Sequence, residues 1–255
     1  MMDLKLRGKA AVVNGASQGI GFAIARSLAA EGVDVLISAR KEDALSKAAE
    51  QINAETGQAV RTVVGDIRML DGCDNIIAAV RERGGVDILI NNDGAPPLGN
   101  ALDFDDLRWT RAFEQNLLSV VRMIRGVAPM MESRGGGSIL NITALTAIQP
   151  LASFGLSVST WAGVVGLAKT LSHELGPKGI RINTLCPGLF ETPRLELAGG
   201  PSAAEYHEAA KMIPLGRKGD VAEIAAVATF FSSPLASYVT GTTLAVDGGM
   251  NKSLL

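Results

Sequence analysis

The stretch Gly15-Ala16-Ser17-Gln18-Gly19-Ile20-Gly21 decides the fold because of what stands on either side of it. Residues 9–14 (KAAVVN) before it form an apolar run typical of a buried strand, and residues 20–31 after it carry apolar side chains at helical spacing. The three glycines permit a tight turn and let a ligand approach the backbone at the helix N-terminus. This order predicts a phosphate-binding turn in an α/β domain.

Strands and helices are predicted to alternate along the rest of the chain. Further strands are expected at 33–38, 59–64, 86–91, 138–142, 181–185 and 243–246, and further helices at 43–55, 69–83, 105–133, 157–175 and 221–232. Such alternation predicts a parallel sheet covered on both faces, and right-handed crossovers make it a doubly wound Rossmann fold. No linker, repeat or low-complexity tract interrupts residues 1–255, which predicts a single domain.

The longest irregular segment is expected to be a lid. It is an insertion at about 189–215, between a strand and a helix. Its apolar side chains either contact an apolar ligand or pack the lid onto the domain; they are Leu189, Phe190, Leu195, Leu197 and Met212.

Composition excludes several classes of function. The 255 residues include 24 basic and 26 acidic side chains, which leaves no positive surplus for nucleic acid. Cys73 and Cys186 stand alone, so neither a disulfide framework nor a metal site is expected. The N-terminus lacks the apolar core of a signal peptide, and no apolar run approaches the ~18 residues of a membrane span. These features predict a cytoplasmic protein with no membrane or nucleic-acid partner.

Further motifs resemble the short-chain dehydrogenase/reductase family, in the branch of chains of this length that includes 3-oxoacyl-ACP reductase-like members. The residues that carry the resemblance are Asp66-Ile67, Asn91-Asn92-Asp93-Gly94, Asn116, Pro187-Gly188 with Thr192, Gly241 and Asp247-Gly248-Gly249. Their order and spacing agree along nearly the whole chain. The resemblance implies seven strands in the order 3-2-1-4-5-6-7 and a homodimer or homotetramer. Four residues either face such a partner or lie in the core: Trp109, Phe113, Val164 and Leu167.

The resemblance also implies a nicotinamide dinucleotide. The residues expected to bind it are Gly15, Ser17, Gln18, Gly19, Ile20, Gly21, Ser38, Arg40, Asp66, Ile67, Asn92, Gly94, Pro187, Gly188 and Thr192. NAD-specific folds place an acidic residue after the second strand, but residues 38–41 (SARK) contain none. Arg40 with Ser38 suits a 2′-phosphate, so NADP is favoured over NAD. The alternative is that Arg40 and Lys41 merely begin a solvated helix.

Two positions in the cofactor motifs depart from the family. Asn14 replaces the usual Thr, and its amide is still able to bond to the turn after the fourth strand. Asp93 replaces the usual Ala and brings a carboxyl near an anionic cofactor, unless it is paired or turned away.

The catalytic tetrad of the family (Asn, Ser, Tyr and Lys) is largely absent. The flanking motifs GSILNIT (137–143) and GLAKTL (166–171) place Ala144, Ser157 and Trp161 at the Ser, Tyr and Lys positions, and only Asn116 remains. A serine is far less acidic than a phenol, and an indole has one donor and no charge. Thr143 and Thr146 either donate to a substrate oxygen or cap the end of the strand.

Two readings of function remain open. One is an NADP-binding oxidoreductase with atypical or very weak activity on an apolar carbonyl or alcohol. The other is a non-catalytic NADP-binding subunit that pairs with an active relative. Non-redox use of the cleft, as in related dehalogenases, fits poorly because those proteins keep Ser and Tyr.

Overall fold

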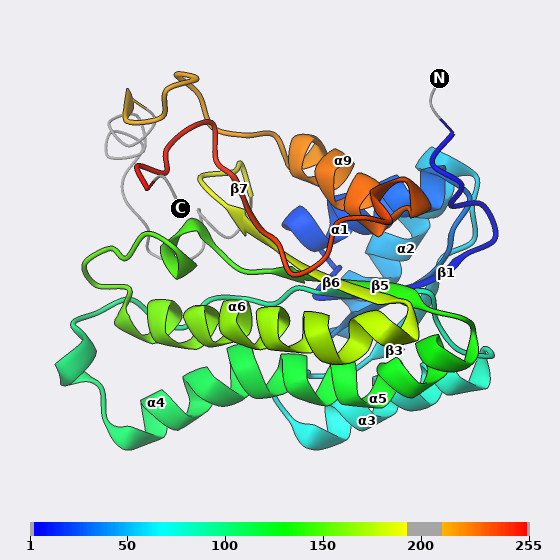
Figure 1. The fold of residues 1–255 in the computed structure, drawn as a ribbon, viewed down its shortest axis with the longest axis horizontal. Coiled ribbons are helices and arrows are strands. Elements are labelled where there is room, and N and C mark those ends of the chain that lie inside the picture. The colour runs from blue at the N-terminus through cyan, green and yellow to red at the C-terminus, as the bar shows by residue number, and fades with distance from the viewer. Residues whose placement is uncertain (1–2, 193–210, 254–255) are drawn as a thin grey trace.

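The structure is a computed structural model that describes residues 3–192 and 211–253. The described residues form one seven-stranded parallel sheet in the order β3-β2-β1-β4-β5-β6-β7 (Figure 1). The strands are β1 (Ala10–Asn14), β2 (Asp34–Ala39), β3 (Arg61–Val64), β4 (Ile88–Asn91), β5 (Gly137–Ile142), β6 (Ile180–Pro187) and β7 (Thr243–Val246). The predicted strand count, order and doubly wound class are therefore confirmed.

Helices cover both faces of this sheet (Figure 1). They are α1 (Gly19–Ala30), α2 (Glu42–Thr56), α3 (Leu70–Glu82), α4 (Asp106–Phe113), α5 (Ser119–Ser133), α6 (Gly155–Leu175) and α9 (Val221–Ser232). Successive strand residues point to opposite faces, so Val13 joins one apolar cluster with α1, α2 and α9. Val12 joins the other cluster with α3, α5 and α6. The sheet is thus buried on both sides, as its apolar strands predict.

The long helical stretch predicted at 105–133 is helical from 106 to 133 and contains a π-helical turn. Asp105 caps α4 by accepting from the backbone N–H of Arg108 at 2.8 Å, and a π-helical turn at Glu114–Leu118 then separates α4 from α5. Such turns widen the helix by one residue and occur frequently at functional sites. The predicted helical stretch is therefore confirmed, and the π-helical turn inside it is a detail that apolar periodicity does not register.

Most of the expected lid (193–210, with Leu195 and Leu197) lies outside the described residues. At its start, Phe190 is 5% exposed and pairs through a β-bridge with Gly219, so Phe190 belongs to the core rather than to a ligand surface. Met212 is 62% exposed.

Among the described residues, none of the helices combines the length and hydropathy needed to cross a bilayer.

Candidate cofactor and active site

The glycine-rich turn lies at the carboxyl end of β1. Gly15 has a φ of +61°, and a Cβ there would stand 2.5 Å from the backbone oxygen of Asn92. A Cβ on Gly21 would stand 2.5 Å from the Gly15 oxygen. Both glycines are therefore required by close backbone approaches. Helix α1 begins here without a side-chain cap, so its first N–H groups are available to an anion.

Asn92 holds this turn against the end of β4. Its Nδ2 donates to the backbone oxygens of Gly15 at 3.0 Å and of Asn14 at 3.3 Å. Gly94, two residues further on, accepts a hydrogen bond from the Gln115 side chain at 2.6 Å, which ties the same turn to the π-helix. The predicted residues of the first and fourth strand turns thus come together.

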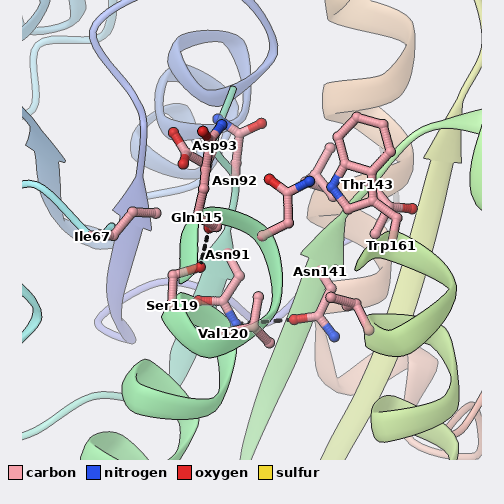
Figure 2. A pocket seen from close by; sticks show the side chains of 13 residues that line it. Ile67, Asn91, Asn92, Asp93, Gln115, Ser119, Val120, Asn141, Thr143 and Trp161 are labelled. Atoms are coloured by element: carbon pink, nitrogen blue, oxygen red, sulfur yellow. Dashed lines mark hydrogen bonds between the residues drawn. The ribbon is translucent and has the colours of Figure 1, made fainter. Parts of the chain in front are cut away.

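Four polar side chains form a ladder across the carboxyl ends of the central strands. Ser38 Oγ donates to Asn14 Oδ1 at 2.8 Å, Asn14 Nδ2 donates to Asn91 Oδ1 at 3.4 Å, and Asn91 Nδ2 donates to Asn141 Oδ1 at 3.0 Å (Figure 2 shows the last bond). All four residues are buried. Asn14 therefore makes the cross-strand bond expected of it, to the last residue of β4.

Ser38 does not fit the role expected of it. Its side chain is fully buried and its hydroxyl is used by Asn14, so it is not presented to a 2′-phosphate. Its orientation follows from the strand alternation, because Ser38 lies in β2 and faces the sheet interior. Arg40 follows the end of β2 and is exposed, which leaves its guanidinium accessible to a phosphate.

Asp66 and Arg68 form an ion pair after β3. Arg68 Nε donates to Asp66 Oδ1 at 2.9 Å and to Oδ2 at 3.1 Å. The hydrogen bonds from Arg68 hold the pKa of Asp66 below its usual range. Asp66 therefore stays ionised, and adjacent Ile67 lies 7% exposed on the wall of the cavity described below.

The segment after β6 meets the glycine-rich turn from the other side. Pro187 ends β6, and a Cβ on Gly188 would stand 2.7 Å from the Asp247 Cβ, so this loop packs closely on the C-terminal segment. A Cβ on Gly19 would lie 3.6 Å from the Thr192 methyl group. Thr192 thus reaches the start of α1, and its contact with a nicotinamide stays a prediction.

Two of the four positions that the resemblance assigns to the tetrad, Asn116 and Trp161, line a small cavity of about 20 Å³, and Figure 2 shows Trp161 on its wall. Asn116, in the π-helical turn, is buried and donates through Nδ2 to Thr160 Oγ1 at 2.8 Å. Trp161, on α6, is 8% exposed and lines the cavity with Asn116 and Thr143. Ser157, one turn earlier on α6, is fully buried.

Several polar atoms around this centre have no hydrogen-bond partner within the described part of the chain. They are Asp93 Oδ2, Asn116 Oδ1, Asn141 Nδ2, Thr146 Oγ1 and Ser157 Oγ. Buried polar groups are normally paired, and Asp93, Asn116 and Asn141 all line the cavity, so their three unpartnered atoms indicate a place for a polar ligand or ordered water. A cavity of this size has room for about one water molecule.

Thr143 lines the cavity, and its hydroxyl bonds to the end of β6. Its Oγ1 donates to the Leu185 oxygen at 3.2 Å and lies 3.2 Å from Cys186 Sγ. Burial raises the pKa of the Cys186 thiol, so this cysteine is a neutral neighbour. Neither residue is suited to give up a proton at neutral pH.

Asp93 is the titratable residue on the cavity wall. It follows β4 directly and faces the same cavity as Trp161, from the opposite side (Figure 2). Burial raises its pKa to about 6, although a hydrogen bond from the Gly94 backbone and the charges of Arg40 and Arg68 act in the other direction. The sequence draws attention to Asp93 only because it departs from the family motif.

Sequence reasoning did not single out Asn141, Gln115 or Arg68. The register supplies a signal for Asn141, because it pairs with Asn91 across β4 and β5. The spacing of Asp66 and Arg68 is a weak signal of the same kind. No pattern in the sequence indicates that Gln115 reaches Gly94.

A doubly wound sheet with an uncapped, glycine-bounded helix start at the end of β1 defines a nucleotide-binding α/β protein. The family model described as enoyl-(acyl carrier protein) reductase matches residues 15–251. Human dehydrogenase/reductase SDR family member 4 is 33% identical over 246 residues, covering 96% of this chain and 88% of the relative. The chain belongs to the short-chain dehydrogenase/reductase family.

Other relatives agree with this assignment. The 3-oxoacyl-[acyl-carrier-protein] reductase of Chlamydia muridarum is 34% identical, covering 98% of this chain and all of the relative. Among solved structures, L-sorbose reductase from Gluconobacter frateurii, complexed with NADPH and L-sorbose, has a TM-score of 0.94. The two chains are 34% identical, and the match covers 99% of this chain and all of the reductase chain.

Proposed function

We propose that this protein binds NADP(H) together with a small apolar carbonyl or alcohol compound, and that its oxidoreductase activity is atypical or very weak. The single observation that supports cofactor binding is the uncapped start of α1. It follows a turn that requires glycine at Gly15 and Gly21. The similar sorbose reductase was solved with NADPH, which supports the same cofactor.

The residues present fit a dinucleotide. The Gly15–Gly21 turn leaves backbone N–H groups for the pyrophosphate, and exposed Arg40 suits the 2′-phosphate. Ionised Asp66 and the apolar Ile67 side chain stand beside the expected adenine position. Pro187, Gly188 and Thr192 would hold the nicotinamide end, where the cofactor supplies or accepts a hydride.

The residues at the reacting centre argue for weak chemistry. The buried Ser157 hydroxyl cannot replace a phenol as proton donor, and Trp161 provides no positive charge to lower a neighbouring pKa. Loss of general acid catalysis costs ~10²–10⁴ in rate. Asn116 and Asn141 can still orient a polar group through their unpartnered amide atoms.

A second candidate is a non-catalytic NADP(H)-binding subunit. The substitutions at all of Ala144, Ser157 and Trp161 favour it, because they remove every charged or acidic member of the tetrad while leaving the nucleotide turn intact. Such a subunit would assemble with further copies or with an active relative. Of the four residues considered for that interface, Val164 is buried inside the chain, whereas Phe113 is 38% exposed.

The cofactor assignment predicts that NADPH binds more tightly than NADH by ~1–3 kcal/mol, the scale of charge-assisted bonds to one phosphate. Isothermal titration calorimetry with both cofactors measures this difference. Arg40→Ala should remove most of it, while Lys47→Ala, an equivalent loss of an exposed charge on α2, should not. Equal affinities in the wild type, or tighter NADH binding, would contradict the assignment.

A further inference from the structure

We propose that Asp93 is a cofactor-site residue that binds the dinucleotide as a neutral carboxylic acid, so that cofactor binding takes up a proton. This inference rests on the proposed function, because it requires an anionic nucleotide in the cleft.

The position of Asp93 is fixed by its neighbours. Asn92 is bonded to the backbone of the glycine-rich turn, and Gly94 is bonded to Gln115. The backbone of Asp93 is therefore held in the cleft by the contact between the β1 and β4 turns. Figure 2 shows Asp93 beside Asn92, on the wall of the cavity that faces Trp161.

The surroundings of the Asp93 carboxyl stabilise its ionised form poorly. The backbone N–H of Gly94 donates to it, but the buried Oδ2 has no partner in the described residues. The charged groups that act on it are Arg40 from the end of β2, and Asp66 and Arg68 from the turn after β3. Arg68 is already paired with Asp66, and the neighbours from the π-helix, Gln115 and Asn116, are uncharged.

A bound dinucleotide would destabilise the ionised form of Asp93 further. Its phosphates bring negative charge to the start of α1, and Arg40 would turn to the 2′-phosphate. A like charge nearby disfavours ionisation. The protonated carboxyl has the opposite property, because it becomes a donor and can bond to an oxygen of the nucleotide. The raised pKa of Asp93 in the free protein, about 6, agrees with this direction.

The affinity for NADPH is therefore expected to fall as the pH rises. Below about pH 6 the carboxyl is already neutral and binding needs no proton. Above it, each unit of pH should weaken NADPH binding by up to tenfold and should draw close to one proton from the buffer. At about pH 8 the total penalty approaches 100-fold.

The experiment is calorimetric titration of NADPH into wild-type protein, Asp93→Asn and the control Asp103→Asn, from about pH 5 to about pH 8. Two buffers of different ionisation enthalpy report the protons taken up. Asp103 is an exposed aspartate at the end of a 3-10 helical turn (Ala101–Asp103) and does not line the cavity, so its replacement makes the same change of charge elsewhere. The Asp93→Asn profile also supplies the baseline for ionisation of the 2′-phosphate itself.

We expect wild type and Asp103→Asn to lose affinity relative to Asp93→Asn as the pH rises, with proton uptake that Asp93→Asn lacks. A parallel pH dependence in wild type and Asp93→Asn would overturn the inference and leave NADP(H) binding standing. Binding by Asp93→Asn alone, at every pH, would also overturn it, since Asp93 would then exclude the cofactor. Failure of every variant to bind would refute the proposed function as well. If Asp93→Asn does not fold, Asp93→Ala, which has the residue usual in the family, takes its place.

Discussion

Asp87 and Asp93 lie just before β4 and just after it, and their carboxyls respond to opposite surroundings. Asp87 accepts from the backbone N–H of Ala10 at 2.8 Å and from Arg134 Nη2 at 2.9 Å, with Lys9 Nζ 3.7 Å away. Burial opposes its ionisation, yet the bonds from Arg134 and Ala10 lower its pKa overall. Asp93 is half-buried and accepts one backbone hydrogen bond, and burial of its carboxyl raises its pKa. Partners thus outweigh burial at Asp87, whereas burial outweighs the partners at Asp93.

We expect Asp87→Ala to destabilise the fold by about 3 kcal/mol, because it leaves the buried Ala10 N–H and Arg134 without their acceptor. The folded-state pKa is lowered, so this stability is present above the unfolded value near pH 4 and is lost as the pH falls through the folded value. Urea denaturation at neutral and acidic pH measures it, with Asp103→Ala as the exposed control. An equal loss of stability in both variants at neutral pH would contradict this account.

Residue-level prediction from the sequence located residues that a backbone requirement dictates, while their contacts with a cofactor stay predictions. Gly15, Gly21 and Asn92 were placed at the cofactor turn, where close backbone approaches and backbone hydrogen bonds now explain them. It failed at Ser38, because the chemistry of a hydroxyl does not reveal which face of a strand it occupies. The sequence drew attention to Asp93, but its protonation depends on the surroundings created by the fold.

At the scale of elements, helix α6 carries the two residues that the resemblance assigns to the family's Tyr and Lys positions, Ser157 and Trp161. They are one turn apart; Trp161 lines the cavity with Asn116 from the π-helical turn, and Ser157 is fully buried. Strand and helix order followed from apolar periodicity alone. The π-helical turn did not, because its extra residue leaves the apolar pattern of α4 and α5 almost unchanged.

This arrangement predicts negligible ketone reduction by the wild type, even with protein in stoichiometric excess over NADPH. The triple variant Ala144→Ser, Ser157→Tyr, Trp161→Lys should create measurable reduction, and each single change should do little, because such residues act as a unit. Loss of the buried indole is expected to cost ~3–5 kcal/mol of packing. NADPH absorbance measures turnover, and calorimetry checks that the variant still binds.

A folded, NADPH-binding triple variant that stays inert would show that the cavity has diverged beyond these three side chains. Robust turnover by the wild type would contradict the proposed loss of the tetrad chemistry. Turnover by the Ser157→Tyr single variant alone would instead show that the lysine position is dispensable here.

For the molecule as a whole, stability is expected to be concentrated at the centre of the sheet. The strands β1 and β4 are buried throughout, between the two apolar clusters on either face. The edge strand β3 has three of its four residues exposed, and β7 at the other edge is half-buried along its length. The periodicity of the sequence predicted the two covered faces, whereas the contrast between centre and edges follows from strand order.

Hydrogen exchange followed by mass spectrometry should therefore find the slowest amides in β1 and β4 and faster exchange in β3 and β7, because edge amides open without disrupting the core. The two edges should respond differently to protein concentration if copies of the chain associate. Exposed Phe230 lies on α9, which contacts β6, the neighbour of β7, and exposed Tyr238 shortly precedes β7 in the chain, so exchange in β7 should slow as concentration rises while β3 stays unchanged. Equal exchange in β3 and β1 would contradict the central location of stability. Concentration-independent exchange in β7 would argue against an assembly through that edge.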